Sequence, residues 1–172
     1  MLLPEKIQQV LNGDFLIQEM SELFKSSTSA LFLGRGSHYP IAMEGALKMK
    51  EITYIHAEGY AAGELKHGPI ALVEDNVPIV VIAPDDELTD KLASNVKEVV
   101  ARGGRVVVIG GKKSVNALFD DAFSALTLPD VDPFISPIVS VIPMQLLAYH
   151  VAVIKGTDVD RPRNLAKSVT VE

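Results

Sequence analysis

The sequence predicts an α/β domain of three layers, in which a five-stranded parallel sheet lies between helices on both of its faces. Two observations carry this prediction. From residue 29 onward, short runs rich in β-branched residues alternate with helical segments, the pattern of a parallel sheet covered on both faces. The 172 residues have the length of one compact domain, and a hydrophobic share of 48% is enough for a sizeable core. The expected topology is flavodoxin-like or Rossmann-like.

Five segments are expected to form the strands. The clear ones are residues 30–33, 78–83 and 105–109, and the weaker ones are residues 53–56 and 122–128. Short apolar runs of this kind are typical of strands that are buried on both faces.

Helical spacing predicts the elements around these strands. Two amphipathic patterns, residues 4–11 and 14–25, predict a helical arm over residues 1–28. Residues 87–102 carry apolar side chains close to helical spacing and end at two glycines, which predicts a further helix.

One long apolar stretch, residues 137–154, has almost the length of a membrane span. A proline and two polar residues interrupt it near its middle. We interpret it as the last buried helix of a domain that spans residues 29–156 and is followed by a tail, residues 157–172.

Composition excludes several classes of function. Lysine and arginine number 16 against 22 acidic residues, a formal net charge of −6. Nucleic acids and anionic membranes attract basic proteins, so neither is an expected partner. The chain has no cysteine, which excludes disulfides, thiolate metal sites and a cysteine nucleophile within it. These features are compatible with a cytoplasmic protein.

A first candidate site is the turn after the strand at residues 30–33. Gly34 and Gly36 begin as a dinucleotide fingerprint would, but Tyr39 stands where its third glycine belongs. Two interpretations stay open. Backbone amides and Ser37 could bind an anion at the start of the next helix, or the segment could be a plain strand-to-helix turn.

A second candidate is a narrow charged stripe on that next helix. At 100° per residue, Glu44, Lys48 and Glu51 fall within about 60° of one another, while apolar residues occupy most of the remaining surface. Such a stripe could face a cleft or an interface. It could equally form ion pairs with itself on a solvated face.

A third candidate is the loop HAEGYAAGELKHGP, residues 56–69, which holds two histidines, two glutamates and one lysine. It lacks the residue spacing of known metal-binding motifs, so we expect no metal there. This density of ionisable groups beside glycines favours a functional loop over a merely solvated one.

The segments EGALKMKEITYIHAEGYAAGELKHGP and QLLAYHVAVIKGTDVDRPRNLAKSVTVE resemble the C-terminal sugar isomerase (SIS) domain of the glutamine:fructose-6-phosphate amidotransferases. The resemblance covers nearly the whole chain. It implies a three-layer SIS fold, a part in converting fructose 6-phosphate and glutamine-derived ammonia to glucosamine 6-phosphate, and no cofactor. The chain lacks the S-Q-S-G-E-T-type phosphate loop of the family's first SIS domain, so a second SIS domain, inactive by itself, is implied.

The resemblance also implies roles for four residues. Glu51 matches the carboxylate that moves a proton between C1 and C2 of the sugar, and Lys48 matches a lysine that stabilises the negative charge of the intermediate. His67 matches the histidine of ring opening, which reaches the site from a neighbouring subunit. Lys167 matches the lysine that forms a Schiff base with the open-chain ketose.

The resemblance thus predicts a homodimer that binds a sugar phosphate. The alternative is a free-standing sugar-phosphate-binding or regulatory module that keeps the SIS fold. The presence of Glu51, His67 and Lys167 favours the enzyme.

Overall fold

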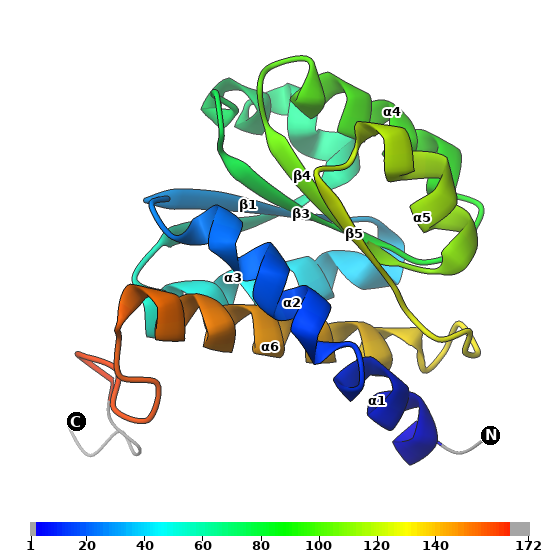
Figure 1. Ribbon diagram of the computed structural model, residues 1–172. Coiled ribbons are helices and arrows are strands. Elements are labelled where there is room, and N and C mark those ends of the chain that lie inside the picture. Colours follow the sequence, from blue (N-terminus) through cyan, green and yellow to red (C-terminus); the bar gives the residue numbers. More distant parts are fainter. Residues whose placement is uncertain (1–2, 166–172) are drawn as a thin grey trace, which may run out of the picture.

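The computed structural model describes residues 3–165 and shows one parallel sheet between two layers of helices (Figure 1). The order of the strands across the sheet is β2-β1-β3-β4-β5. Every pair of neighbours is parallel. The strands are β1 (Ser29–Gly34), β2 (His56–Ala61), β3 (Pro78–Ala83), β4 (Arg105–Gly110) and β5 (Ser124–Thr127).

The helices divide between the two faces of this sheet. In Figure 1, α2 and α6 lie below the sheet, and α4 and α5 lie above it. The lower layer contains α1 (Leu3–Leu11), α2 (Asp14–Ser21), α3 (Tyr39–Thr53) and α6 (Ser136–Lys155). The upper layer contains α4 (Thr89–Val100), α5 (Lys112–Leu118) and the 3-10 helix η3 (Ala62–His67). The remaining short 3-10 helices are η1 (Glu22–Phe24), η2 (Gly36–His38), η4 (Pro69–Leu72) and η5 (Phe119–Asp121).

The strands separate two hydrophobic cores because successive side chains point to opposite faces. Phe32 of β1 belongs to the lower core, whereas its neighbours Leu31 and Leu33 belong to the upper one. In β3, Val80 and Ile82 join the lower core in the same way. The three central strands are therefore buried on both faces, as their apolar sequences predict.

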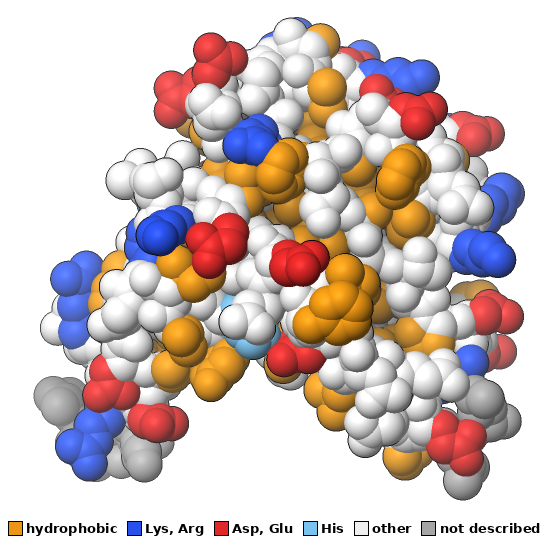
Figure 2. Space-filling view, viewed as in Figure 1, with side chains coloured by type: hydrophobic (Ala, Val, Ile, Leu, Met, Phe, Trp, Pro, Cys, Tyr) orange, Lys and Arg blue, Asp and Glu red, His pale blue; other side chains and the backbone are white. Residues whose placement is uncertain are grey.

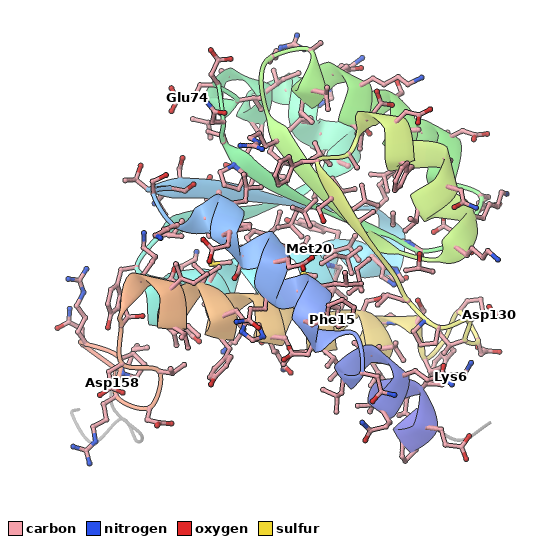
Figure 3. All side chains as sticks on the ribbon, viewed as in Figure 1. Lys6, Phe15, Met20, Glu74, Asp130 and Asp158 are labelled. Atoms are coloured by element: carbon pink, nitrogen blue, oxygen red, sulfur yellow. The ribbon has the colours of Figure 1, made fainter. Side chains whose placement is uncertain are left out.

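The first two helices pack against the sheet domain. Figure 3 labels Met20 and Phe15, which come from α2. Met20 is buried in the lower core, and Phe15 is 61% exposed. The helices expected within residues 1–28 are thus confirmed, and their apolar face covers the sheet.

The predicted strands are confirmed at residues 30–33, 78–83 and 105–109, and the fifth is shorter than residues 122–128. The prediction at residues 53–56 is wrong. Thr53 still belongs to α3, which ends at Tyr54 in the left-handed conformation, with φ of 63°. Strand β2 begins only at His56 and lies at the edge of the sheet, where its polar residues reach the surface.

The helix predicted over residues 137–154 is confirmed as α6. Among residues 3–165 it is the one helix long and apolar enough to cross a membrane by length and composition, and half of that stretch is buried inside the domain. Its side chains Val139, Met144, Leu147 and Val151 form part of the lower core. A core helix of an α/β domain has the same composition.

The tight turn after β1 generates a prediction about stability. A Cβ atom on Gly34 would lie 2.2 Å from the carbonyl oxygen of His38, which is backbone and cannot move alone. The Gly34→Ala variant should therefore unfold more easily, by about 1–3 kcal/mol. In the matched control Gly63→Ala, the new methyl group meets only the end of the flexible Arg35 side chain. Urea unfolding followed by circular dichroism measures both, and equal midpoints would contradict the prediction.

Candidate functional site

The charged stripe lies on α3, whose position is fixed by its opposite face. Ala42, Ala46 and Met49 are buried against the sheet. Gly45 lets the helix approach closely, since a Cβ there would lie 2.9 Å from the ring of Phe32. At helical spacing, these four residues place the stripe on the side of α3 that faces away from the sheet.

The three residues of the stripe form ion pairs with one another. Lys48 Nζ lies 2.6 Å from Glu51 Oε2 and 3.8 Å from Glu44 Oε1. Their side chains are between 28% and 38% exposed, so the stripe is half-covered. The self-paired arrangement that the sequence left open is therefore present.

The pair Lys48–Glu51 sets the charge of this stripe. The hydrogen bond that Lys48 donates to Glu51 raises the pKa of the lysine, and partial burial opposes this effect. Lys48 is accordingly a fixed cation beside a carboxylate. Such a pair can hold a proton acceptor in place and can stabilise negative charge that develops next to it.

The segment after α6 returns to the end of α3. The backbone N–H of Arg163 donates to the hydroxyl of Tyr54 at 2.9 Å, and the Arg163 guanidinium lies 4.0 Å from the centre of the Tyr54 ring. Thr157 donates to the carbonyl of Ile52 at 2.6 Å. The chain is thereby fixed beside the helix end that carries Glu51. Lys167 lies outside the described residues.

The structure places His67 away from this stripe. His67 ends η3 in the upper layer, whereas α3 belongs to the lower layer, so the sheet lies between them. Its ring Nδ1 lies 2.7 Å from Glu64 Oε2, and both side chains are about 70% exposed (72% and 68%). The turn that ends at His67 is a 3-10 helix, and its Lys66 forms an ion pair with Glu98 of α4 at 2.7 Å. Within one chain, Glu51 and Lys48 meet and His67 does not join them.

Strand β2 contains a tyrosine–carboxylate hydrogen bond that sequence reasoning did not find. Tyr60 donates a hydrogen bond to Glu58, which raises the pKa of Tyr60 to about 12 and lowers the pKa of Glu58. His56 lies 3.2 Å from the other oxygen of Glu58. Within residues 3–165, no three His, Asp or Glu side chains come close enough together to hold a metal ion.

Sequence reasoning also missed a cavity at the carboxyl ends of the strands. It encloses about 130 Å³ and extends from the turn after β1 to the first turns of α6. His38 is buried there, with ring nitrogens 3.2 Å from Ser37 Oγ and 3.0 Å from Ser136 Oγ. Burial lowers the pKa of His38, and the nearby Asp86 partly opposes this. The candidate turn with Ser37 thus belongs to a cavity whose other wall comes from the far end of the sequence.

Comparisons with known proteins agree with this architecture. The model of the SIS domain family matches residues 22–155. The glutamine–fructose-6-phosphate aminotransferase [isomerizing] of Zymomonas mobilis is 56% identical over 169 residues, which are 98% of this chain and 28% of that protein. The protein of the same description from Escherichia coli K12 is 56% identical over 170 residues, 99% of this chain and 28% of its own length.

A solved structure shows the same arrangement in space. The C-terminal domain of glucosamine-fructose-6-phosphate aminotransferase from Francisella tularensis superposes with a TM-score of 0.85 at 52% identity, covering 90% of this chain and 43% of that one. The chain thus spans somewhat more than a quarter of the length of the curated relatives it matches. With the family model covering most of its length and the five-stranded parallel sheet in place, the chain belongs to the SIS domain family.

Proposed function

We propose that this chain acts as the second SIS domain of a glutamine–fructose-6-phosphate aminotransferase. In that role it would carry much of the isomerase machinery that makes glucosamine 6-phosphate from fructose 6-phosphate and ammonia in the cytoplasm. The observation that carries the proposal is the Lys48–Glu51 pair on α3. Identity of 56% to aminotransferases over nearly the whole chain supports it.

The pair suits the isomerisation step chemically. Moving a carbonyl from C2 to C1 requires that one group remove the proton from one carbon and return it to the other. Glu51 supplies a carboxylate for this transfer. The ammonium group of Lys48 lies on the same face of the helix and stabilises the negative oxygen of the enediol-type intermediate.

Lys167 is proposed to bind the open-chain ketose as a Schiff base. An amine attacks a carbonyl only when it is unprotonated, and a nearby cation such as Lys48 favours that form. The attachment of Arg163 to Tyr54 supports this proposal, because it brings the chain that precedes Lys167 to the Glu51 end of α3.

His67 is proposed to serve the site of a partner subunit. Its separation from Glu51 by the sheet leaves it no role in the site of its own chain, and it is exposed enough to enter another. Exposed apolar residues in the layer that carries Glu51 offer the surface on which the partner would dock. They are Met43 and Leu47 of α3 with Tyr149 and Val153 of α6. Figure 2 shows exposed hydrophobic side chains on the lower face of the molecule, where α6 lies.

The role of Glu51 is tested in a protein that contains both SIS domains, because the chain alone is expected to lack the phosphate loop. Glu51→Gln should slow exchange of the sugar C1 or C2 proton with deuterated water by about 10²- to 10⁴-fold, measured by NMR. The matched control is Glu44→Gln, which removes the longer ion pair and keeps the 2.6 Å pair. Equal rates in the two variants would contradict the proposal.

The role of Lys167 is tested by trapping the imine. Fructose 6-phosphate with borohydride should label Lys167 irreversibly in the two-domain protein, and peptide mass spectrometry should locate the adduct. Lys167→Arg should keep the charge and abolish the labelling, because guanidinium does not form the imine. Lys113→Arg serves as the control on the upper layer. Labelling spread evenly over surface lysines would reject the assignment.

Pairing of two chains is tested by light scattering at about 50 μM, on the order of ordinary assay concentrations. The chain should have the mass of a dimer, and Tyr149→Glu should convert it to a monomer because a charge would be buried in an apolar contact. Phe119→Glu in the upper layer places the same charge on a site that is also exposed, 64% against 48% for Tyr149, and should leave the dimer intact. A monomeric parent chain would count against the pairing.

A further inference from the structure

The cavity at the carboxyl ends of the strands lies where open α/β sheets bind ligands. In the sheet order β2-β1-β3-β4-β5, β2 lies on one side of β1, and β3 and the later strands lie on the other side. The direction in which strands are added therefore reverses between β1 and β3. Ligands of such sheets bind in the crevice at this reversal, outside the carboxyl ends of the strands. The turn after β1, the segment after β3 and the segment after β4 all line the cavity.

Neutral polar groups line the inner wall. His38 is held between Ser37 and Ser136, and its lowered pKa keeps the ring uncharged at neutral pH. Ser140 is only 2% exposed and also lines the cavity. A hydroxyl that lines a cavity can form a hydrogen bond with a ligand bound there. Each of these groups can both donate and accept, which suits the hydroxyl groups of a ligand.

Apolar side chains form a second part of the wall, and the charged residues Asp85, Asp86, Lys112 and Asp130 also line the cavity. Three prolines, Pro84, Pro129 and Pro133, line the cavity together with Leu128 and Val139. These side chains can contact the C–H faces of a saturated ring. A volume of about 130 Å³ fits one six-membered ring, since a cavity of about 150 Å³ holds one benzene molecule.

The cavity is unsuited to phosphate, because carboxylates of the chain already occupy the backbone amides. Asp85 accepts hydrogen bonds from the backbone N–H groups of Lys113 and Ser114, at 3.1 and 2.8 Å. Asp86 accepts one from Leu88 at 2.8 Å, where α4 begins. A phosphate would have to displace these carboxylates and then lie beside their negative charge.

The cavity is also separate from the stripe on α3. In Figure 3, Asp130 at the rim of the cavity and Asp158 in the segment after α6 lie at opposite ends of the molecule. Helix α6 connects the two ends, and its 20 residues span about 30 Å. Glu51 lies 12 residues beyond the start of α3, about 18 Å along that helix from the turn at His38.

We propose that this cavity is a second ligand site, which binds one neutral, polyhydroxylated ring of monosaccharide size and rejects its phosphate ester. The Ser140 hydroxyl and the His38 ring would bind hydroxyl groups of the ligand ring, and the proline wall would contact its apolar face. The proposal does not depend on the role of Glu51, so the two can fail independently.

The test is a titration of the ¹⁵N-labelled chain with D-glucose and, separately, with glucose 6-phosphate, followed by NMR. Glucose should shift the amide signals of Ser37, Gly111 and Ser140 with a dissociation constant below about 30 mM. Glucose 6-phosphate should bind at these residues at least tenfold more weakly. Absence of shifts up to about 100 mM glucose, shifts centred on Glu51, or equal binding of the ester would each overturn the proposal.

Variants identify the residues responsible. Ser140→Ala should weaken glucose binding about three- to tenfold by removing one hydrogen bond, and Ser140→Leu should abolish it by filling the cavity. The matched control is Ser21→Ala, since Ser21 is an equally buried helical serine that instead donates to the carbonyl of Gln18. Spectra that retain the dispersion of the parent chain show that each variant is folded. Unchanged affinity in folded Ser140→Leu would overturn the proposal.

Discussion

Burial of the central strands on both faces is the constraint on which the rest of this structure depends. The side chains of β3 are all buried, and those of β4 are buried from Val106 to Ile109. Removing each of these aliphatic side chains from water contributes about 1.5–3 kcal/mol, an upper estimate, provided that helices cover both faces. The interior is thereby committed to apolar packing. Charged and reactive side chains must therefore lie on helix faces that point away from the sheet or in segments at the ends of the strands.

This constraint explains why the charged stripe of α3 and the turn with His67 lie in different layers of the chain. Helix α3 must turn Ala46 and Met49 toward Phe32, and its charged stripe therefore faces outward in the lower layer. The turn with His67 follows the edge strand and packs in the upper layer through Leu65. The sheet lies between them, and it is too thick for a side chain to reach across. Within one chain these residues therefore do not meet.

The strengths and failures of the sequence prediction have the same physical origin. Residues 78–83 and 105–109 were predictable because strands buried on both faces are apolar throughout. Strand β2 was misplaced for two reasons. As an edge strand it is only partly buried, so its sequence HAEGYA contains no apolar run. The helix before it ends at Tyr54 in the left-handed conformation, and a tyrosine does not indicate a helix end in the sequence as a glycine would. The pairing of Lys48 with Glu51 follows from helical spacing alone. The cavity could not be predicted, since His38 and Ser136 are 98 positions apart and meet only through the fold.

The carboxylates of Asp85 and Asp86 accept hydrogen bonds from backbone N–H groups of the loops at the ends of the strands. Backbone N–H groups that could have bound a phosphate donate instead to carboxylate oxygens of the chain itself. Gly111 leaves the space that the Asp85 carboxylate fills. At the proposed ligand site, selectivity against charged ligands would depend on these two side chains rather than on the sheet and helices around them. Domains of this architecture can therefore diverge between charged and uncharged ligands by exchange at a few loop positions, while the fold that supports those loops stays the same.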